Sequence, residues 1–421
     1  MIKTFEISPG VTLRCYRIHK FKQSCFSIQL VQPMDKDTVS ANVLIPAILL
    51  RGTQRHPDLQ RITWHLDDLY GASVTALARR IGDYQAVGLH AAFLEDRFAL
   101  PGEKILSPVL DFLRELLLEP VLEDGGFSRE FTESEKKNLI SAIDAQINDK
   151  RSWAASQLLR TMCEADSFGI PRLGTREQVA ALDHQSVYEQ YRKLLRTGKI
   201  ELFYVGSEEP QAVAQLAGNL LCGVERSYCP LPAQTPFCDG GPKEQVCKME
   251  VAQGQLCMGF LTPITNAAPE FAAMQVLNTV FGGGMTSKLF LQVREKHALC
   301  YFVGSGYYAA KGIVTVSAGI DWEKETVTRQ EILHQLQLCK DGEITQQELC
   351  AAKEAILSGL QSVQDSPGAI ESYYGVLNLS AMKLTLEEYM EAVRQVTVEQ
   401  AVAAAKTLQP HSYWFLKGVE E

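Results

Sequence analysis

Two segments of the chain share one pattern at one spacing. Residues 66–91, LDDLYGASVTALARRIGDYQAVGLHA, align without a gap with residues 293–318, VREKHALCYFVGSGYYAAKGIVTVSA, and Gly71 falls on Ala298. Each copy contains a helix end, a strand, a turn and a second strand, and each follows an apolar helix and a strand. A repeat of this length predicts two similar α+β domains rather than a solenoid of short units. The alternative is a chance likeness between two α+β segments.

The composition is that of an acidic protein with more than one core. Hydrophobic residues make up 46% of the 421 positions, which predicts at least two domains. The net charge of −9 and the lack of basic blocks argue against nucleic acid and anionic membranes as partners. The first residues resemble no secretory signal, and the longest apolar runs are too short to span a bilayer. The cysteines are scattered, with Cys257 and Cys300 in apolar surroundings, which favours free thiols in a reducing, cytoplasmic location.

One stretch without apolar periodicity divides the chain. Residues 223–245, GVERSYCPLPAQTPFCDGGPKEQ, are rich in proline and glycine and predict a linker. The linker separates an N-terminal domain, residues 1–222, from a C-terminal domain, residues 246–421. Within the first domain the pattern predicts a hairpin that turns at Gly82 and one long polar helix over residues 128–162.

The most informative local motif is FGGGMTSKLFLQVREKHALCYFVGSGYY, residues 281–308. Its three glycines predict a loop with little steric barrier, and Thr286 or Ser287 can cap the helix that follows. Arg294 falls in the last turn of that helix and Tyr301 opens the next strand, so the pair could hold a carbonyl group or a peptide backbone. The alternative is a solvated helix charge and a half-buried strand aromatic. The spacing of a phosphate-binding loop is absent.

The part of this motif that reads GGGMTSKLFLQVREKHALCYFV resembles the signature of the pitrilysin-like zinc peptidases, the family of insulin-degrading enzyme and the mitochondrial processing peptidase. The resemblance covers essentially the whole chain. It implies two duplicated α+β domains, each an antiparallel-rich sheet flanked by helices, arranged as half of a clamshell. It also implies that Arg294, Tyr301, Gly282, Gly283 and Gly284 bind and position a peptide substrate. A narrower likeness to bacterial YmfF-like proteins implies a link to the aminopentanol modification of elongation factor P.

The zinc-binding motif of this family, H-x-x-E-H, is absent. When the sequences are anchored on residues 51–53, Arg-Gly-Thr, the first histidine falls on Val43, the glutamate on Pro46 and the second histidine on Ala47. None of these side chains can bind a metal ion or accept a proton. Because proline is tolerated only near the start of a helix, the helix here is expected to begin between residues 42 and 45.

The third zinc ligand of the family also has no counterpart. If Glu135 matches the earlier acid of the family's second motif, the ligand position falls on Ala142. A replacement metal site built from His65, His90 and His297 is the alternative, although His90 sits in an apolar strand and is better explained as a core histidine. The sequence therefore predicts no catalytic residue, no metal ion and no cofactor in this chain.

These features favour the catalytically incomplete subunit of a two-chain zinc peptidase. Its expected partner is a homologue that carries H-x-x-E-H, and its expected ligand is a peptide or protein substrate. Alone, the chain is expected to be inactive. The rival hypothesis is a scaffold or assembly subunit that kept the fold and lost every role in proteolysis, and a third is a peptidase with an unrecognised metal site of its own.

Overall fold

The computed structural model describes residues 2–419, which form two compact units. Unit 1 consists of residues 2–144, 171–234 and 363–379; unit 2 consists of residues 145–170, 235–362 and 380–419. The domain borders predicted from the sequence are contiguous, whereas the compact units exchange one segment in each direction. A helix from the first half of the chain belongs to unit 2, and a helix from the second half belongs to unit 1.

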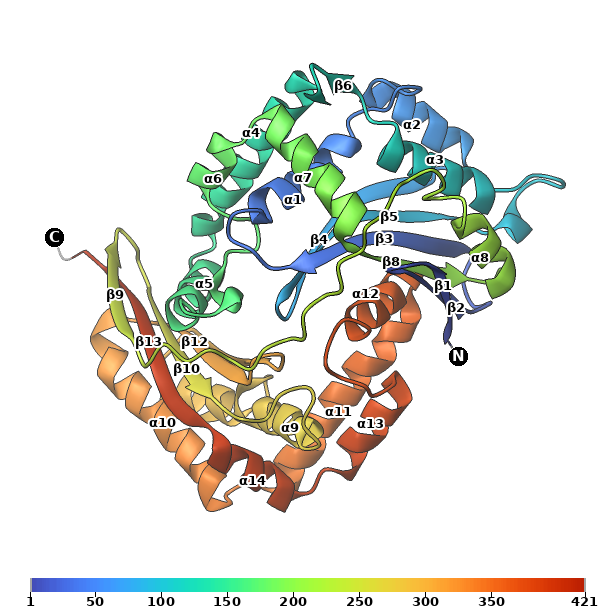
Figure 1. Ribbon diagram of the computed structural model, residues 1–421. Helices are drawn as coiled ribbons and strands as arrows, with labels where there is room; N and C mark the ends of the chain where they lie inside the picture. The colour runs from blue at the N-terminus through green and yellow to red at the C-terminus, as the bar shows by residue number, and fades with distance from the viewer. Residues whose placement is uncertain (1, 420–421) are drawn as a thin grey trace. The chain divides into compact units, whose positions relative to one another are not determined.

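Unit 1 is built on a six-stranded sheet with the order β1-β2-β8-β3-β5-β4 (Figure 1). Neighbouring strands are antiparallel except β2 and β8, which are parallel. The hairpin of β4 and β5 turns at Gly82, as the sequence predicts. The strands of unit 1 are β1 (Ile2–Ser8), β2 (Val11–Arg17), β3 (Gln23–Pro33), β4 (Ser73–Ile81), β5 (Tyr84–Leu94), β8 (Lys199–Gly206) and the short pair β6 (Leu122–Glu123) and β7 (Gly126–Phe127).

Helices cover both faces of this sheet. Ile28 and Leu30 of β3 belong to the main core, which α1, α3 and α7 share, whereas Ser27 and Gln29 donate hydrogen bonds of 2.6 and 3.0 Å to Glu371 of α12. Because side chains alternate along a strand, α12 lies on the face opposite α1. The helices of unit 1 are α1 (Val39–Leu49), α2 (Leu59–Asp68), η1 (Asp96–Phe98), α3 (Leu106–Leu118), α4 (Arg129–Ala145), α6 (Arg176–Ala181), α7 (His184–Thr197), α8 (Pro210–Ala217), η6 (Val363–Asp365) and α12 (Pro367–Leu377).

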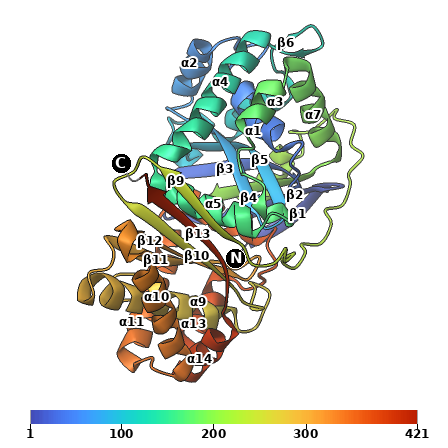
Figure 2. The same ribbon diagram turned by 90° about the vertical axis from the view of Figure 1, so that its left-hand side faces the viewer.

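The sheet of unit 2 repeats the topology of unit 1. Its order is β11-β12-β10-β13-β9, which corresponds to β4-β5-β3-β8-β2, and its one parallel pair, β9 and β13, matches β2 and β8. Gly71 and Ala298, aligned from the sequence, both have positive φ at the entry to an edge strand. The predicted duplication is therefore confirmed at the level of strand order. Figure 2 shows β9, β13 and β10 side by side. The strands are β9 (Glu244–Met249), β10 (Gly254–Leu261), β11 (Phe302–Tyr308), β12 (Ile313–Ile320) and β13 (Gln409–Gly418).

Helix α5 is the segment that unit 2 takes from the first half of the chain. Its Leu158 packs with Cys257 of β10 and Trp414 of β13, whereas Leu256 and Met258 belong to the core on the other face, which α9 and α14 share. The helices of unit 2 are η2 (Gln146–Asn148), α5 (Lys150–Met162), η3 (Ser167–Gly169), α9 (Phe271–Gly282), η4 (Leu289–Lys296), η5 (Trp322–Lys324), α10 (Glu325–Asp341), α11 (Gln346–Ser362), α13 (Leu386–Gln395) and α14 (Val398–Thr407).

Two helix predictions were wrong. The long helix expected over residues 128–162 breaks after Ala145, and Asp149 then caps α5 by accepting a hydrogen bond from the amide of Ser152 at 3.1 Å. Helix α1 begins at Val39, so Pro46 lies inside it rather than near its start. Within residues 2–419, no helix has the length and apolar character needed to cross a membrane.

Candidate functional site

The positions that correspond to the family's zinc ligands lie on α1 and α4 of unit 1. Val43 and Ala47 are half-buried and one turn apart, so they share a face of α1, and Pro46 is buried. Ala142 is exposed on α4. The earlier acid, Glu135, pairs with Arg51 at 3.5 Å. These four hydrocarbon side chains offer no nitrogen, oxygen or sulfur atom, so they do not fit a zinc ion.

Side chains from neighbouring elements explain how α1 tolerates an internal proline. Gln85 of β5 donates to the carbonyl oxygen of Val39 at 3.1 Å and accepts from the side-chain nitrogen Nδ2 of Asn42 at 2.7 Å. Gln190 of α7 donates to the side-chain oxygen of Asn42 at 2.9 Å. This buried network fixes the first turns of α1 from the sheet and from α7, so the helix does not depend on the hydrogen bond that Pro46 lacks.

The structure does not support the alternative metal site. His65 stacks on His56 with 4.6 Å between ring centres, and burial lowers the pKa of His65. His90 lies on β5, where burial lowers its pKa, and His297 follows η4 in unit 2. Within residues 2–419, no three His, Cys, Asp or Glu side chains are grouped so that they could hold a metal ion.

The two cysteines singled out in the sequence, Cys257 and Cys300, are not nucleophile candidates. Cys257 and Cys300 are buried, as predicted, and burial raises the pKa of both thiols to about 11. At neutral pH such thiols stay protonated, so they act as small apolar groups.

The glycine-rich loop lies in unit 2 and leads from α9 into η4. The N-cap of η4 is Lys288, whose side chain makes no capping hydrogen bond, and the hydroxyl of the preceding Ser287 accepts a hydrogen bond from the amide of Phe290 at 3.3 Å. Segment η4 is a π-helix, with the amide of His297 donating to the carbonyl of Gln292 at 3.0 Å. Such widened turns are rare in proteins, and those that occur are often found at functional sites. The π-helix carries Arg294, whose guanidinium carbon lies 4.7 Å from the ring centre of Phe290.

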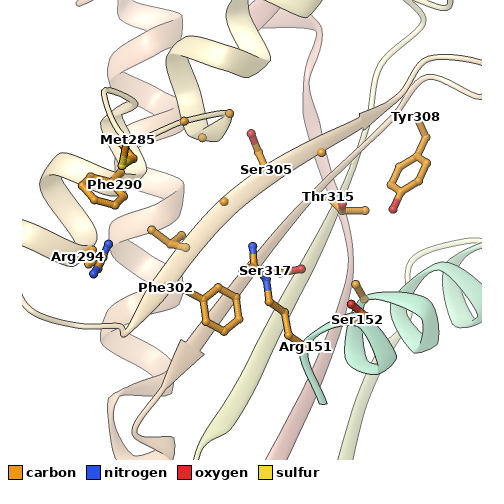
Figure 3. A pocket seen from close by; sticks show the side chains of 17 residues that line it. Arg151, Ser152, Met285, Phe290, Arg294, Phe302, Ser305, Tyr308, Thr315 and Ser317 are labelled. Atoms are coloured by element: carbon orange, nitrogen blue, oxygen red, sulfur yellow. The ribbon is translucent and has the colours of Figure 1, made fainter. Parts of the chain in front are cut away.

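A cavity of about 500 Å³ opens beside this loop (Figure 3). Its walls are Gly282, Gly283, Gly284 and Met285 of the loop, Phe290 and Arg294 of η4, edge strand β11 with residues of β12, and the first turn of α5. The structure thus brings four of the five predicted site residues to one cavity. The other residues that line this cavity, above all Arg151 and Phe302, were not predicted from the sequence. No local signal marks Arg151, because it reaches the cavity only through the exchange of α5.

The fifth predicted residue, Tyr301, lies beside this cavity rather than in it. It lines a smaller cavity of about 300 Å³ together with Arg294 and Asp321. The tyrosine is 54% exposed, and its hydroxyl donates a hydrogen bond of 2.8 Å to Asp321. That hydrogen bond raises the pKa of Tyr301 and lowers the pKa of Asp321. Arg294 is therefore the residue that links the two cavities.

Comparison with known proteins finds a family model that matches part of the chain and relatives that are similar over most of it. Residues 181–356 match the family described as the peptidase M16 inactive domain. The probable inactive metalloprotease YmfF of Bacillus subtilis is 27% identical over 411 residues, which cover 98% of this chain and 96% of that protein. An uncharacterized zinc protease of Mycobacterium leprae is 24% identical over 317 residues, covering 73% of this chain and 70% of that protein.

Solved structures share the fold over the whole chain. A conserved protein from Enterococcus faecalis superposes with a TM-score of 0.93 at 24% identity and covers 100% of this chain and 99% of that one. A peptidase M16 inactive domain from Pseudomonas fluorescens gives a TM-score of 0.81 at 16% identity, covering 100% and 98% of the two chains. The strand order, the hydrocarbon at the ligand positions and these similarities agree: the chain is similar over nearly its whole length to an inactive metallopeptidase homologue, and its residues 181–356 match the peptidase M16 inactive domain.

Proposed function

We propose that this chain is the catalytically incomplete subunit of a heterodimeric zinc peptidase. It would bind a peptide substrate and position it for a partner that carries the H-x-x-E-H motif. One contrast carries the proposal: the positions of the zinc ligands and of the general base hold only Val43, Pro46, Ala47 and Ala142, while the glycine-rich loop and Arg294 line an open cavity. A chain that had lost every contact with substrate would have no reason to keep that cavity unfilled.

Edge strand β11 is the natural binding surface in this cavity. It ends the sheet of unit 2, so one side of its backbone has no neighbouring strand, and an extended peptide can add there as a further strand. Gly304 and Gly306 leave that backbone without side chains where it faces the cavity. The guanidinium of Arg294 can then donate hydrogen bonds to peptide carbonyl oxygens, which fixes the register of the peptide.

A second candidate function is a scaffold or assembly subunit without a role in proteolysis. The observation that favours it is the engaged hydroxyl of Tyr301, which donates to Asp321 and lies outside the larger cavity. The link to elongation factor P modification stays a prediction of the sequence resemblance and adds nothing to either candidate.

Reconstitution with a homologue from the same genome that carries H-x-x-E-H tests the proposal. Cleavage of a fluorogenic peptide library is expected from the mixture and not from this chain alone. Arg294→Ala should lower kcat/KM of the mixture about tenfold or more, as expected for a lost charged hydrogen bond, and Tyr301→Phe should lower it less.

The matched control is Lys296→Ala, which removes a positive charge from the same helix at a residue that lines neither cavity. Unchanged cleavage by the mixture containing Arg294→Ala would refute the positioning role and favour the scaffold. Chelator-sensitive cleavage by this chain alone, or about one tightly bound zinc ion per chain, would refute the proposal as a whole.

A further inference from the structure

The cavity beside β11 has an unbalanced charge. Arg151 and Arg294 are its only ionisable side chains apart from Tyr308, and no aspartate or glutamate lines it. We propose that this cavity is an anion subsite, in which Arg151 and Arg294 bind a carboxylate group of the peptide. The inference rests on the proposed function for its ligand, an extended peptide on β11, and goes beyond it by naming the chemical class that the cavity selects.

The aromatic ring of Phe302 holds Arg151 in place. The guanidinium carbon of Arg151 lies 4.1 Å from the ring centre of Phe302, and one terminal nitrogen lies 4.0 Å from the point that a β-carbon on Gly304 would occupy. The side chain, which starts in the first turn of α5, therefore reaches β11 beside Phe302 (Figure 3). Stacking covers one face of a guanidinium and leaves its in-plane N–H donors free for a planar anion.

No acid forms a salt bridge with Arg151 within the described part of the chain. None of the salt bridges among residues 2–419 includes it. The nearest acid in sequence, Asp149, is engaged elsewhere, because its carboxylate accepts the amide of Ser152 at 3.1 Å. The hydrogen bonds with Ser152 are the main cause of the lowered pKa of Asp149, and the charge of Arg151 contributes little.

Arg294 approaches the same cavity from η4 and is held in the same way. Its guanidinium stacks on Phe290, and its one ion pair, with the adjacent Glu295, is loose at 3.6 Å. Figure 3 shows Arg151 and Arg294 on the two sides of Phe302. Two stacked guanidinium groups that line one cavity beside an edge strand suit the carboxylate of an extended peptide.

Two sources can supply the carboxylate, an acidic side chain or the free C-terminus of the peptide. The test therefore uses fluorescein-labelled peptides of one length in three forms: one central Glu with an amidated C-terminus, Gln at that position with an amidated C-terminus, and Gln with a free C-terminus. Fluorescence anisotropy measures the Kd of each with the full chain. We expect the Glu peptide to bind about fivefold more tightly than the amidated Gln peptide at low salt, with a smaller ratio at high salt.

Arg151→Gln should remove this preference and leave the Kd of the amidated Gln peptide unchanged, and Arg151→Lys should keep part of the preference. The matched control is Arg160→Gln, an exposed arginine in the last turn of the same helix that does not line the cavity. A preference shown only by the free C-terminus would assign the subsite to a terminal carboxylate. Equal affinity for all three peptides, or a preference that Arg151→Gln retains, overturns the anion subsite alone. If no peptide binds in any form, the subsite and the proposed function both fail.

Discussion

Replacement of Gly304 by alanine should stabilise the fold and impair ligand binding at the same time. Gly304 lies in edge strand β11 and is not among the glycines with positive φ, so an alanine can adopt its backbone conformation. The added β-carbon would lie 3.5 Å from the carbonyl oxygen of Gly282 and 4.0 Å from a guanidinium nitrogen of Arg151. Both distances are ordinary van der Waals contacts, so nothing in the strand has to move.

The magnitude follows from the unfolded chain and from the cavity. Where the native backbone is compatible, Gly→Ala raises the free energy of unfolding by about 0.4–1 kcal/mol, because the unfolded chain loses conformational freedom. For a unit of this size that corresponds to a rise of about 1–4 °C in Tm. The same methyl group projects into the cavity between the loop and Arg151, where a bound peptide would lie. Overpacking of this kind typically costs about 1–3 kcal/mol, which predicts peptide affinity about tenfold lower.

The assay combines differential scanning calorimetry with fluorescence anisotropy on the full chain. Its matched control is Gly359→Ala in α11 of the same unit, an exposed helical glycine whose added β-carbon meets no atom within 4 Å. That change should raise the Tm by a similar amount, since alanine exceeds glycine in helix propensity by about 1 kcal/mol, and leave peptide affinity as it was. If Gly304→Ala lowers the Tm, the steric reasoning is wrong. If it raises the Tm and peptides still bind with unchanged affinity, the cavity is not where they bind.

Three further predictions concern stability. Glu371→Gln should lower the free energy of unfolding in urea by about 3 kcal/mol, because the buried carboxylate accepts hydrogen bonds of 2.6 and 3.1 Å from Arg79; a change below 1 kcal/mol would contradict this. Lys311→Met should lower the free energy of unfolding by a similar ~3 kcal/mol, because the substitution leaves the buried carboxylate of Asp166, 3.2 Å from Lys311, without its cation. Adding Asp166→Asn to the Lys311→Met protein should restore part of this loss. Burial lowers the pKa of His90 below 6.5, so the folded state binds a proton at His90 less readily than the unfolded state does. His90 therefore takes nothing from the free energy of unfolding above pH 6.5, and its protonation in the unfolded state lowers that free energy as the pH falls from 6.5 to the folded pKa. His90→Gln should therefore reduce the decline in urea midpoint between pH 7 and pH 5, and an identical decline in both proteins would refute this role.

The repeat in the sequence was sufficient to predict that the two halves of the chain share an arrangement of strands. The aligned copies each specify a hairpin with the second strand buried, and β5 and β12 occupy the same place in the two sheets. Positive φ at both Gly71 and Ala298 shows why their spacing is shared, since each enters an edge strand through the same backbone bend. Alternation of apolar residues predicted the strands of both hairpins, whereas the break between α4 and α5 and the start of α1 were predicted wrongly.

Periodicity could not indicate which sheet a helix covers. The apolar face of α5 fits a sheet of either unit equally well, and only the structure shows Leu158 against Cys257 and Trp414. Arg151 was missed for the same reason, because it precedes the glycine-rich loop by more than a hundred residues and has no motif of its own. The π-helix at η4 was also beyond prediction, since its residues satisfy ordinary helical periodicity and the widened turn depends on how the end of the helix packs.

Helix α1 and the cavity beside β11 differ in how their residues affect the stability of the fold. Proline inside a helix costs about 3 kcal/mol in isolation, yet α1 keeps Pro46 because Asn42, Gln85 and Gln190 secure the helix from the sheet and from α7. That segment is organised for packing, and metal donors could be lost from it without loss of the fold. Strand β11 does the reverse: it places Gly304 and Gly306 where side chains with higher strand propensity would be more stable, and leaves Arg151 without an acid among the described salt bridges. The proposed subunit, which would bind a peptide and leave the chemistry to a partner, would use both features: a helix of unit 1 without metal ligands at the zinc-ligand positions and an unfilled, positively charged edge in unit 2.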